Sequence, residues 1–245
     1  MYNIEIVELP QIDAIDVCIG TSSILFSNTG NTDGIWSVSG GGSINPLTGE
    51  FTPTTAGCFT ATFITNNGSC QDTDTFVVFP ASPVLLDPTN TCNTTFALPI
   101  VTSVSGFTTE FSINGATFTA TPILPSTPGC YSITARYVLS ADCGTTLAGA
   151  IGSGLCGVSN TVSALIYPSE PVLTAPTNTC NAAFVLPAVT PVVGFTVQYS
   201  INGGTWATAP TIPTTPGCHT IAARYVNTAA CGLTAALTPS AIAGC

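Results

Sequence analysis

One pattern constrains this chain more than any other: a tight turn, a cysteine and an alternating strand that recur at a fixed interval. Residues 128–138 read PGCYSITARYV, and residues 216–226 read PGCHTIAARYV. A looser version, AGCFTATF, occupies residues 56–63. In residues 131–137 apolar side chains stand at every second position, and Ser, Thr and Arg stand between them. This alternation is typical of a half-buried strand in an antiparallel sheet.

The repeat extends well beyond this strand. Cys92 and Cys180 lie in identical PTNTCN motifs, which gives a period of 88 residues (180 minus 92), and the same interval separates Cys130 from Cys218. A period of domain length predicts tandem domains, each with its own core. Short alternating segments, turn residues and the lack of helical periodicity are typical of sandwiches. The expected fold class is all-β: three tandem immunoglobulin-like β-sandwich domains, disulfide-stapled, in an elongated array.

The expected domains cover residues 11–80, 81–168 and 169–245. Residues 1–10 resemble the final strands that end at Pro80 and Pro168, so we expect them to be the final strand of a preceding or partner domain. No such strand follows in the third domain, which is expected to lack its last strand. Strand addition between copies would complete that sheet. A cut within a continuous polypeptide explains the same ends equally well. The strand-exchange candidates are Tyr2, Ile4, Ile6, Val7 and Leu9.

The strand pattern also predicts which side chains face inward. Trp36 occupies a strand where immunoglobulin-like cores carry a packing Trp. Trp206 aligns with Phe118, and we expect it in the core and not on a ligand platform. Asn114-Gly115 and Asn202-Gly203 are predicted to form tight turns. The expected core residues are Phe107, Thr109, Phe111 and Ile113, and in the next repeat Phe195, Val197, Tyr199 and Ile201.

Composition excludes several functions. The chain of 245 residues has two arginines, no lysine and a formal net charge of −10. Nucleic acids and anionic membranes both require clustered positive charge, so neither is an expected partner. No apolar run approaches the ~20 residues of a membrane helix, so no membrane insertion is expected. Met1–Glu5 lacks the features of an intact signal peptide.

The chain offers no catalytic constellation. His219 is the single histidine, and its counterpart in the earlier repeat is Tyr131. With a single histidine, placed on a strand, no Ser/His/Asp constellation can be assembled, and His219 is expected at a position that also accepts tyrosine. We therefore expect that the chain is not an enzyme. The sequence also contains no CxxC pair, so no metal site is expected.

Charged residues are few and suggest structural roles. Asp13, Asp16, Asp72 and Asp74 make calcium at a domain junction a candidate. Their spacing favours a solvated acidic surface, so no cofactor is expected. Glu110 and Arg136 are predicted to pair across neighbouring strands, and Gln198 is the predicted partner of Arg224.

Eleven cysteines with repeating spacings indicate an oxidising compartment. Cys130 and Cys143 begin and end one strand, roughly 40 Å apart at ~3.3 Å per residue, so they cannot pair. A Greek-key arrangement then favours pairs at each end of a domain. Cys70 remains as the odd thiol, either free or bonded across a junction to a neighbouring module. The predicted pairs are Cys18–Cys58, Cys92–Cys130, Cys143–Cys156, Cys180–Cys218 and Cys231–Cys245.

The segments 17–22 (VCIGTS), 51–59 (FTPTTAGCF) and 199–204 (YSINGG) resemble the tandem modules of giant Bacteroidetes cell-surface proteins, of which the SprB-like gliding adhesins are the best-known group. The resemblance spans nearly the whole chain. It implies export by a type IX pathway, an extracellular location on the bacterial cell surface, and a stalk or adhesive filament.

These observations predict a non-enzymatic extracellular segment that forms a stiff surface filament. Its expected partners are further copies or neighbouring repeats, and an external surface or polysaccharide is a candidate target. The alternative is a carbohydrate- or surface-binding module, which requires exposed aromatic residues. An enzyme accessory domain is third.

Overall fold

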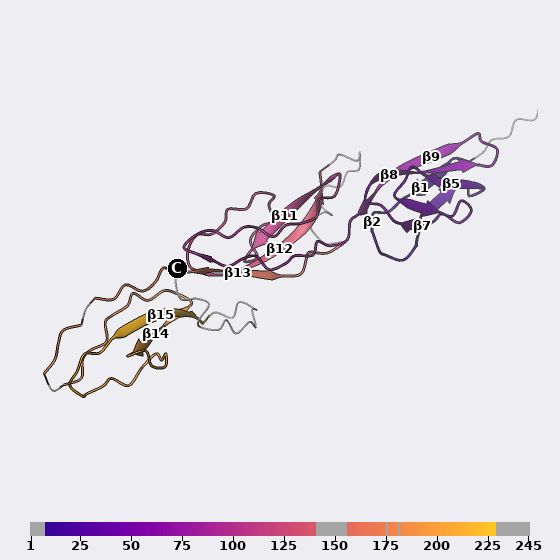
Figure 1. The fold of residues 1–245 in the computed structure, drawn as a ribbon. Helices are drawn as coiled ribbons and strands as arrows, with labels where there is room; N and C mark the ends of the chain where they lie inside the picture. The colour runs from indigo at the N-terminus through magenta and orange to yellow at the C-terminus, as the bar shows by residue number, and fades with distance from the viewer. Residues whose placement is uncertain (1–7, 141–155, 175, 181, 229–245) are drawn as a thin grey trace, which may run out of the picture.

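The computed structural model describes residues 8–140, 156–174, 176–180 and 182–228. These residues form strands and loops with no helix, and they build three bodies that follow one another in a row (Figure 1). No helix in the described ranges has the length and apolar character needed to cross a bilayer. The predicted all-β fold and the elongated tandem array are confirmed.

The first body is a complete immunoglobulin-like sandwich. One sheet has the strand order β2-β9-β8-β5, with β2 parallel to β9, and the opposing sheet has the order β3-β7-β6. A two-stranded sheet, β1-β4, extends beside them. The bounds are β1 Pro10–Asp13, β2 Val17–Cys18, β3 Ile24–Leu25, β4 Ser27–Gly30, β5 Gly34–Val38, β6 Gly42–Ile44, β7 Glu50–Pro53, β8 Gly57–Thr65 and β9 Gln71–Phe79.

Aromatic rings fill the space between these two sheets. Trp36 on β5 is buried and meets the Phe63 ring edge-on, with 5.2 Å between the ring centroids. Phe26 stacks on Phe51 and meets Phe76 edge-on, so rings from both sheets interlock. Aromatic pairs add to the free energy gained by burying their apolar area. The predicted core position of Trp36 is confirmed.

Within its described residues, the second body has one regular sheet, in the order β10-β13-β12-β11. Its strands are β10 Thr91–Cys92, β11 Phe107–Ile113, β12 Gly129–Leu139 and β13 Val162–Tyr167. β10 runs parallel to β13, as β2 does to β9 in the first body. Leu85 and Phe96, which lie on irregular segments, cover the inner face of the sheet and bury Ile133 and Ala135 completely.

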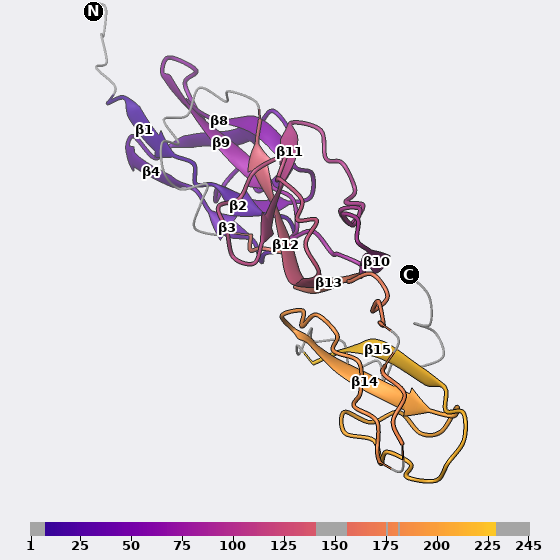
Figure 2. The same cartoon turned by 90° about the vertical axis from the view of Figure 1, so that its left-hand side faces the viewer.

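The described part of the third body repeats the central hairpin of the second. β14 (Phe195–Ile201) pairs with β15 (Ile221–Asn227) as β11 pairs with β12. Glu110 is opposite Arg136, and Gln198 is opposite Arg224 in the same register. Figure 2 shows this hairpin as a separate body beside the second one, and Phe195 at the start of β14 contacts Tyr167 at the end of β13.

The two Asn-Gly turns form as predicted. Asn114 and Gly115 have φ angles of 52° and 73°, and Asn202 and Gly203 have 52° and 70°. The N–H of Ala116 donates to the carbonyl of Ile113 at 3.0 Å and closes the first turn. Asn and Gly tolerate this left-handed backbone better than other residues, which explains the repeated pair.

The predicted inward face of β11 is only partly correct. Phe111 is buried and Ile113 packs against the same core. Phe107 instead contacts Phe79 of the first body, with ring centroids 5.8 Å apart. The alternation is right, but the first residue of the strand lies beyond the domain core, at a junction.

Candidate functional site: the covalent junction between domains

A disulfide bond joins the first body to the second. It links Cys18 to Cys156, residues 138 positions apart in the sequence, with their Cα atoms 5.5 Å apart. Cys18 is buried at the end of β2. Cys156 lies ahead of β13, and its carbonyl accepts a hydrogen bond from the Ser82 hydroxyl. The bridge is therefore a second covalent link beside the peptide linker.

Noncovalent contacts reinforce the same junction. Phe79 ends β9 next to Cys18, because β2 and β9 pair in the register Cys18 with Phe79. The Phe79 ring contacts the Phe107 ring of the second body. An aromatic pair next to the bridge adds to the free energy gained by burying apolar area between the two bodies.

The junction between the second and third bodies has the same parts. Cys92 is opposite Tyr167 in the parallel pair β10-β13, as Cys18 is opposite Phe79. Tyr167 contacts Phe195 with ring centroids 6.2 Å apart, and Phe195 lies one period after Phe107. Cys92 and Cys130 pack in this cluster and are both disulfide-bonded. The contacts at both junctions thus follow the sequence repeat.

The predicted bond between Cys18 and Cys58 is wrong. The prediction placed Cys18 on a strand facing Cys58 across one end of the sandwich. In the structure both lie in one sheet with β9 between them, since Cys18 pairs with Phe79 and Cys58 with Val77. Strands two apart are separated by roughly 10 Å, beyond the reach of a disulfide. Cys58 is nonetheless disulfide-bonded.

The same geometry corrects the other predicted pairs. Cys92 and Cys130 flank β13 and cannot bond to each other. Cys156 is bonded to Cys18, which excludes the predicted Cys143–Cys156 bond. The predicted Cys180–Cys218 bond is also absent, because both residues carry exposed free thiols. The Cys231–Cys245 pair lies outside the described residues.

Cys70, the predicted odd cysteine, carries a free, half-buried thiol. It lies in the turn between β8 and β9, where its carbonyl accepts hydrogen bonds from the backbone N–H of Thr65 at 3.0 Å and from the Thr65 hydroxyl at 3.1 Å. In the second body the connection between the equivalent strands β12 and β13 contains Cys156.

Three of the four acidic residues considered for calcium instead accept backbone hydrogen bonds. Asp72 accepts from the N–H of Ile12 at 2.9 Å, and Asp74 accepts from the N–H of Ala14 at 2.8 Å. Asp16 accepts from the N–H of Val77 at 2.7 Å. These bonds attach residues 12–16 to β9. Within the described ranges no cluster of three metal-binding side chains forms.

Burial raises the pKa of Asp16, the nearby Asp74 charge raises it further, and the hydrogen bond from Val77 opposes both effects. Asn90 stands two residues before Cys92, as Asp16 stands two before Cys18. Its amide oxygen accepts from the N–H of Leu165 at 3.0 Å. The repeat therefore conserves an acceptor at this position but not its charge.

Both arginines bind the partners that the strand pattern predicted. Arg136 donates to Glu110 from Nε at 3.0 Å and from Nη2 at 2.8 Å. Arg224 donates to Gln198 at 3.1 and 2.8 Å from the same two atoms. The Trp206 ring lies under the Arg224 guanidinium, with 4.4 Å from Cζ to the ring centroid. The predicted core position of Trp206 is wrong, since the side chain remains 36% exposed.

The contacts of His219 are structural. Its Nδ1 lies 3.0 Å from the Asn202 amide nitrogen, and its Nε2 lies 3.1 Å from the Thr215 carbonyl. Its ring contacts Phe184 at 5.9 Å, the same centroid distance as between Tyr131 and Phe96 in the preceding repeat. The arrangement matches the tyrosine that it replaces.

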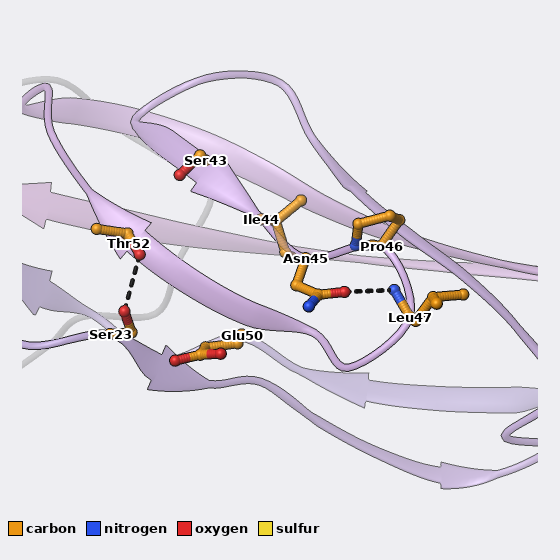
Figure 3. Close-up of a pocket in the computed structure, with 8 residues that line it drawn as sticks. All are labelled: Ser23, Ser43, Ile44, Asn45, Pro46, Leu47, Glu50 and Thr52. Carbon is orange, nitrogen blue, oxygen red and sulfur yellow. Dashed lines mark hydrogen bonds between the residues drawn. The ribbon is translucent and has the colours of Figure 1, made fainter.

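An open hollow of about 590 Å³ lies on the first body (Figure 3). The Ser23 and Thr52 hydroxyls are 2.8 Å apart at one side, and the Asn45 side chain accepts from the Leu47 N–H at the other. Glu50 is the one ionisable group of the lining, and no aromatic ring is part of it. The lining residues are Ser23, Ser43, Ile44, Asn45, Pro46, Leu47, Glu50 and Thr52.

Of the strand-exchange candidates, Leu9 is described, and its side chain is 65% exposed immediately before β1. Tyr2, Ile4, Ile6 and Val7 lie outside the described residues. Strand exchange therefore stays a prediction.

The fold and junctions define a tandem array of immunoglobulin-like domains. No family model and no curated protein match the chain. Among solved structures, the titin fragment I67–I69 (an E-to-A mutated variant) aligns at TM-score 0.37 and 10% identity, over 92% of this chain and 90% of that one. Fibronectin(III)-like modules of Clostridium thermocellum CbhA align at TM-score 0.29 and 11% identity, over 65% and 95%. Human protocadherin-24 EC1-2 aligns at TM-score 0.25 and 10% identity, over 65% and 99%. The immunoglobulin-like assignment itself follows from the strand order of this chain.

Proposed function

We propose that this chain is a non-enzymatic, load-bearing segment of an extracellular filament, in which disulfides across the junctions connect successive domains. The observation that carries the proposal is the Cys18–Cys156 bond, which links two domains and not two strands of one domain. A bridge inside one domain would stabilise that domain alone. A bridge between domains stabilises the array as a whole.

The bridge changes the path that tension takes along the chain. Force applied at the two ends passes through the backbone to Cys18, across the sulfur atoms to Cys156, and onward. The residues between these cysteines, which span a sequence separation of 138, then carry none of the applied tension. The β-sandwich of the first body can unfold without lengthening the rod by its full contour length.

The binding alternative has less support. A carbohydrate- or surface-binding module requires exposed aromatic rings that can stack on a ligand. The Trp206 ring is covered on one face by Arg224, and the hollow of the first body has no aromatic lining. An open hollow with a single carboxylate also offers no paired nucleophile and base, which supports a non-enzymatic role.

We further propose that the filament lies on a bacterial cell surface, where an oxidising environment keeps the bridges formed. Export by a type IX pathway and a role in gliding adhesion are the specific form of this proposal. The resemblance of residues 17–22, 51–59 and 199–204 to gliding-adhesin modules supports it.

Single-molecule pulling between the two ends of the chain tests the load path. In oxidising buffer, the fully unfolded chain should be shorter than in reducing buffer. The difference should reach at least the contour length of the bridged segment, on the order of 450 Å for 138 residues at ~3.3 Å each. A final length that reductant does not change would overturn the proposal.

A further inference from the structure

We propose that Cys218 is the open half of another junction and forms a disulfide with Cys70 of a second copy of this chain. Copies would then join head to tail in a covalent filament. This inference rests on the proposed function, because it extends the same junction beyond one chain.

Cys218 occupies a position that is bonded in both earlier domains. Cys58 and Cys130 hold the same place in the repeated turn-cysteine-strand motif, and both are disulfide-bonded. Cys218 carries an exposed free thiol. Cys180 likewise matches the bonded Cys18 and Cys92 and is also exposed and free. The third domain therefore has both junction cysteines, each without a partner in this structure.

The junction end of each domain is set by the sheet register. Cys130 is opposite Leu165 and Cys92 is opposite Tyr167, and both cysteines join the cluster of Leu165 and Tyr167 against which Phe195 of the next domain also packs. The repeat places Cys218 and Cys180 at the corresponding end of the third domain. A module that follows it would meet these two thiols first.

Cys70 belongs to the opposite end of a domain. It lies in the β8–β9 turn, whereas Cys58 is the second residue of the nine-residue strand β8, near its other end. At ~3.3 Å per residue the two ends are roughly 25 Å apart. The second domain bonds backwards from this end, through Cys156, to the first domain. Cys70 is thus positioned to bond backwards to a preceding copy.

The cysteine spacing selects Cys218 over Cys180 as the partner. The observed bridge joins the β2 cysteine, Cys18, to the later of the two cysteines between β12 and β13, Cys156. Cys70 matches the earlier one, Cys143: it follows Cys58 by 12 residues (70 minus 58), and Cys143 follows Cys130 by 13 (143 minus 130). The later position has no cysteine in the first domain. The partner of Cys70 is therefore expected among the cysteines of the repeated turn-cysteine-strand motif, which are Cys58, Cys130 and Cys218.

Bond formation requires an oxidant. The Cys218 thiolate attacks one sulfur of a small-molecule disulfide such as oxidised glutathione, and one reduced thiol leaves. The Cys70 thiolate of the second copy then attacks this mixed disulfide, forms the Cys70–Cys218 bond and releases the second thiol. Two protein thiols lose two protons and two electrons in total, and one small-molecule disulfide becomes two thiols.

The experiment treats the full chain, with its internal disulfides intact, with oxidised glutathione at high protein concentration. Non-reducing gels, light scattering and disulfide mapping by mass spectrometry follow the products. The native chain should form a ladder of dimers, trimers and longer species that reductant converts to monomer. Cys70→Ser and Cys218→Ser should each abolish the ladder, whereas Cys180→Ser should retain it as a matched control.

Mixing the two single variants gives the sharpest result. A Cys70→Ser chain still carries Cys218, and a Cys218→Ser chain still carries Cys70, so an equimolar mixture should form dimers and nothing longer. A ladder that persists in Cys70→Ser, a Cys180–Cys218 bond within one chain, or monomer alone under all conditions would overturn the inference. Any of these outcomes leaves the pulling result within one chain unaffected, so the two proposals fail separately.

Discussion

Asp16 and Asn90 show how a single repeat position keeps its hydrogen bond while its charge changes. Both side chains accept a backbone N–H from the last strand of their domain, from Val77 in one case and Leu165 in the other. The carboxylate pays an additional free-energy cost, because it is partly desolvated beside Asp74. The amide avoids that cost.

Asp16→Asn should therefore stabilise the first domain at neutral pH, by a free energy within ~1 kcal/mol. The raised pKa means that the folded state binds more protons than the unfolded state above the ordinary carboxyl value of 3.8. The stability of the native domain then falls as pH rises through the window between 3.8 and the raised pKa. Thermal unfolding followed from pH 4 to pH 7 should show the variant's advantage growing with pH.

Asn90→Asp provides the reverse test in the second domain. It should lower the unfolding temperature at pH 7 and have a smaller effect near pH 4, where a larger fraction of the new carboxyl is protonated. If Asp16→Asn were no more stable than the native chain at pH 7, burial would not be the main influence on this carboxylate.

At the scale of single elements, the hairpins β11–β12 and β14–β15 depend on the Asn residue that follows the first strand. The Asn114 side chain accepts from the Ser132 N–H at 2.8 Å, and its backbone N–H donates to the Ser132 carbonyl at 2.9 Å. Asn202 makes the equivalent contacts with Thr220 at 3.0 and 2.9 Å. One residue thus closes a left-handed turn and extends the strand ladder.

Asn114→Ala should destabilise the second domain by about 2 kcal/mol, because it loses a hydrogen bond and places alanine in the left-handed region. Asn114→Gly should cost less, since glycine accepts the same φ angle and loses only the hydrogen bond. Hydrogen exchange of the β11 and β12 amides measures both effects. Equal protection in the alanine and glycine variants would contradict the role assigned to φ.

Sequence alone predicted these elements well because their signals are local. The alternation in residues 131–137, the Asn-Gly pairs and the partners of both arginines each depend on neighbours within one hairpin. Trp206 was misplaced because its alignment with Phe118 says nothing about depth. Both rings lie under an arginine, at 4.4 Å, and Trp206 remains partly exposed.

At the scale of the whole molecule, sequence reasoning found the repeat but missed how its units are joined. The cysteines were paired inside each domain because the spacing does not reveal which strand carries Cys18. Placing it on β2, beside β9, puts Cys58 out of reach and leaves a neighbouring domain as the partner. Phe107 was a weaker indication of the same junction, because it is an apolar residue at a strand end and packs outside the core of its own domain.

Two independent contacts, the disulfide bridge and the aromatic pair, should restrain the relative orientation of the first two domains. Phe107→Ala alone should leave the small-angle X-ray scattering profile in oxidising buffer unchanged, because the covalent link persists. After reduction, the same variant should show a broader distribution of shapes than the reduced native chain. Ile100→Ala, a change at a side chain that is 96% exposed, is the matched control. A broad distribution in oxidising buffer would mean that the bridge does not restrain the junction.

The long sequence separation between Cys18 and Cys156 also determines when their disulfide can form during synthesis of the chain. A polypeptide that emerges amino-terminus first presents Cys18 long before the residue 138 positions later has arrived. The first domain can fold before then, but Cys18 stays reduced until the part of the second domain that contains Cys156 has been made. Disulfide formation should therefore follow synthesis from the amino-terminus, and each domain is bridged only after the next domain has been made.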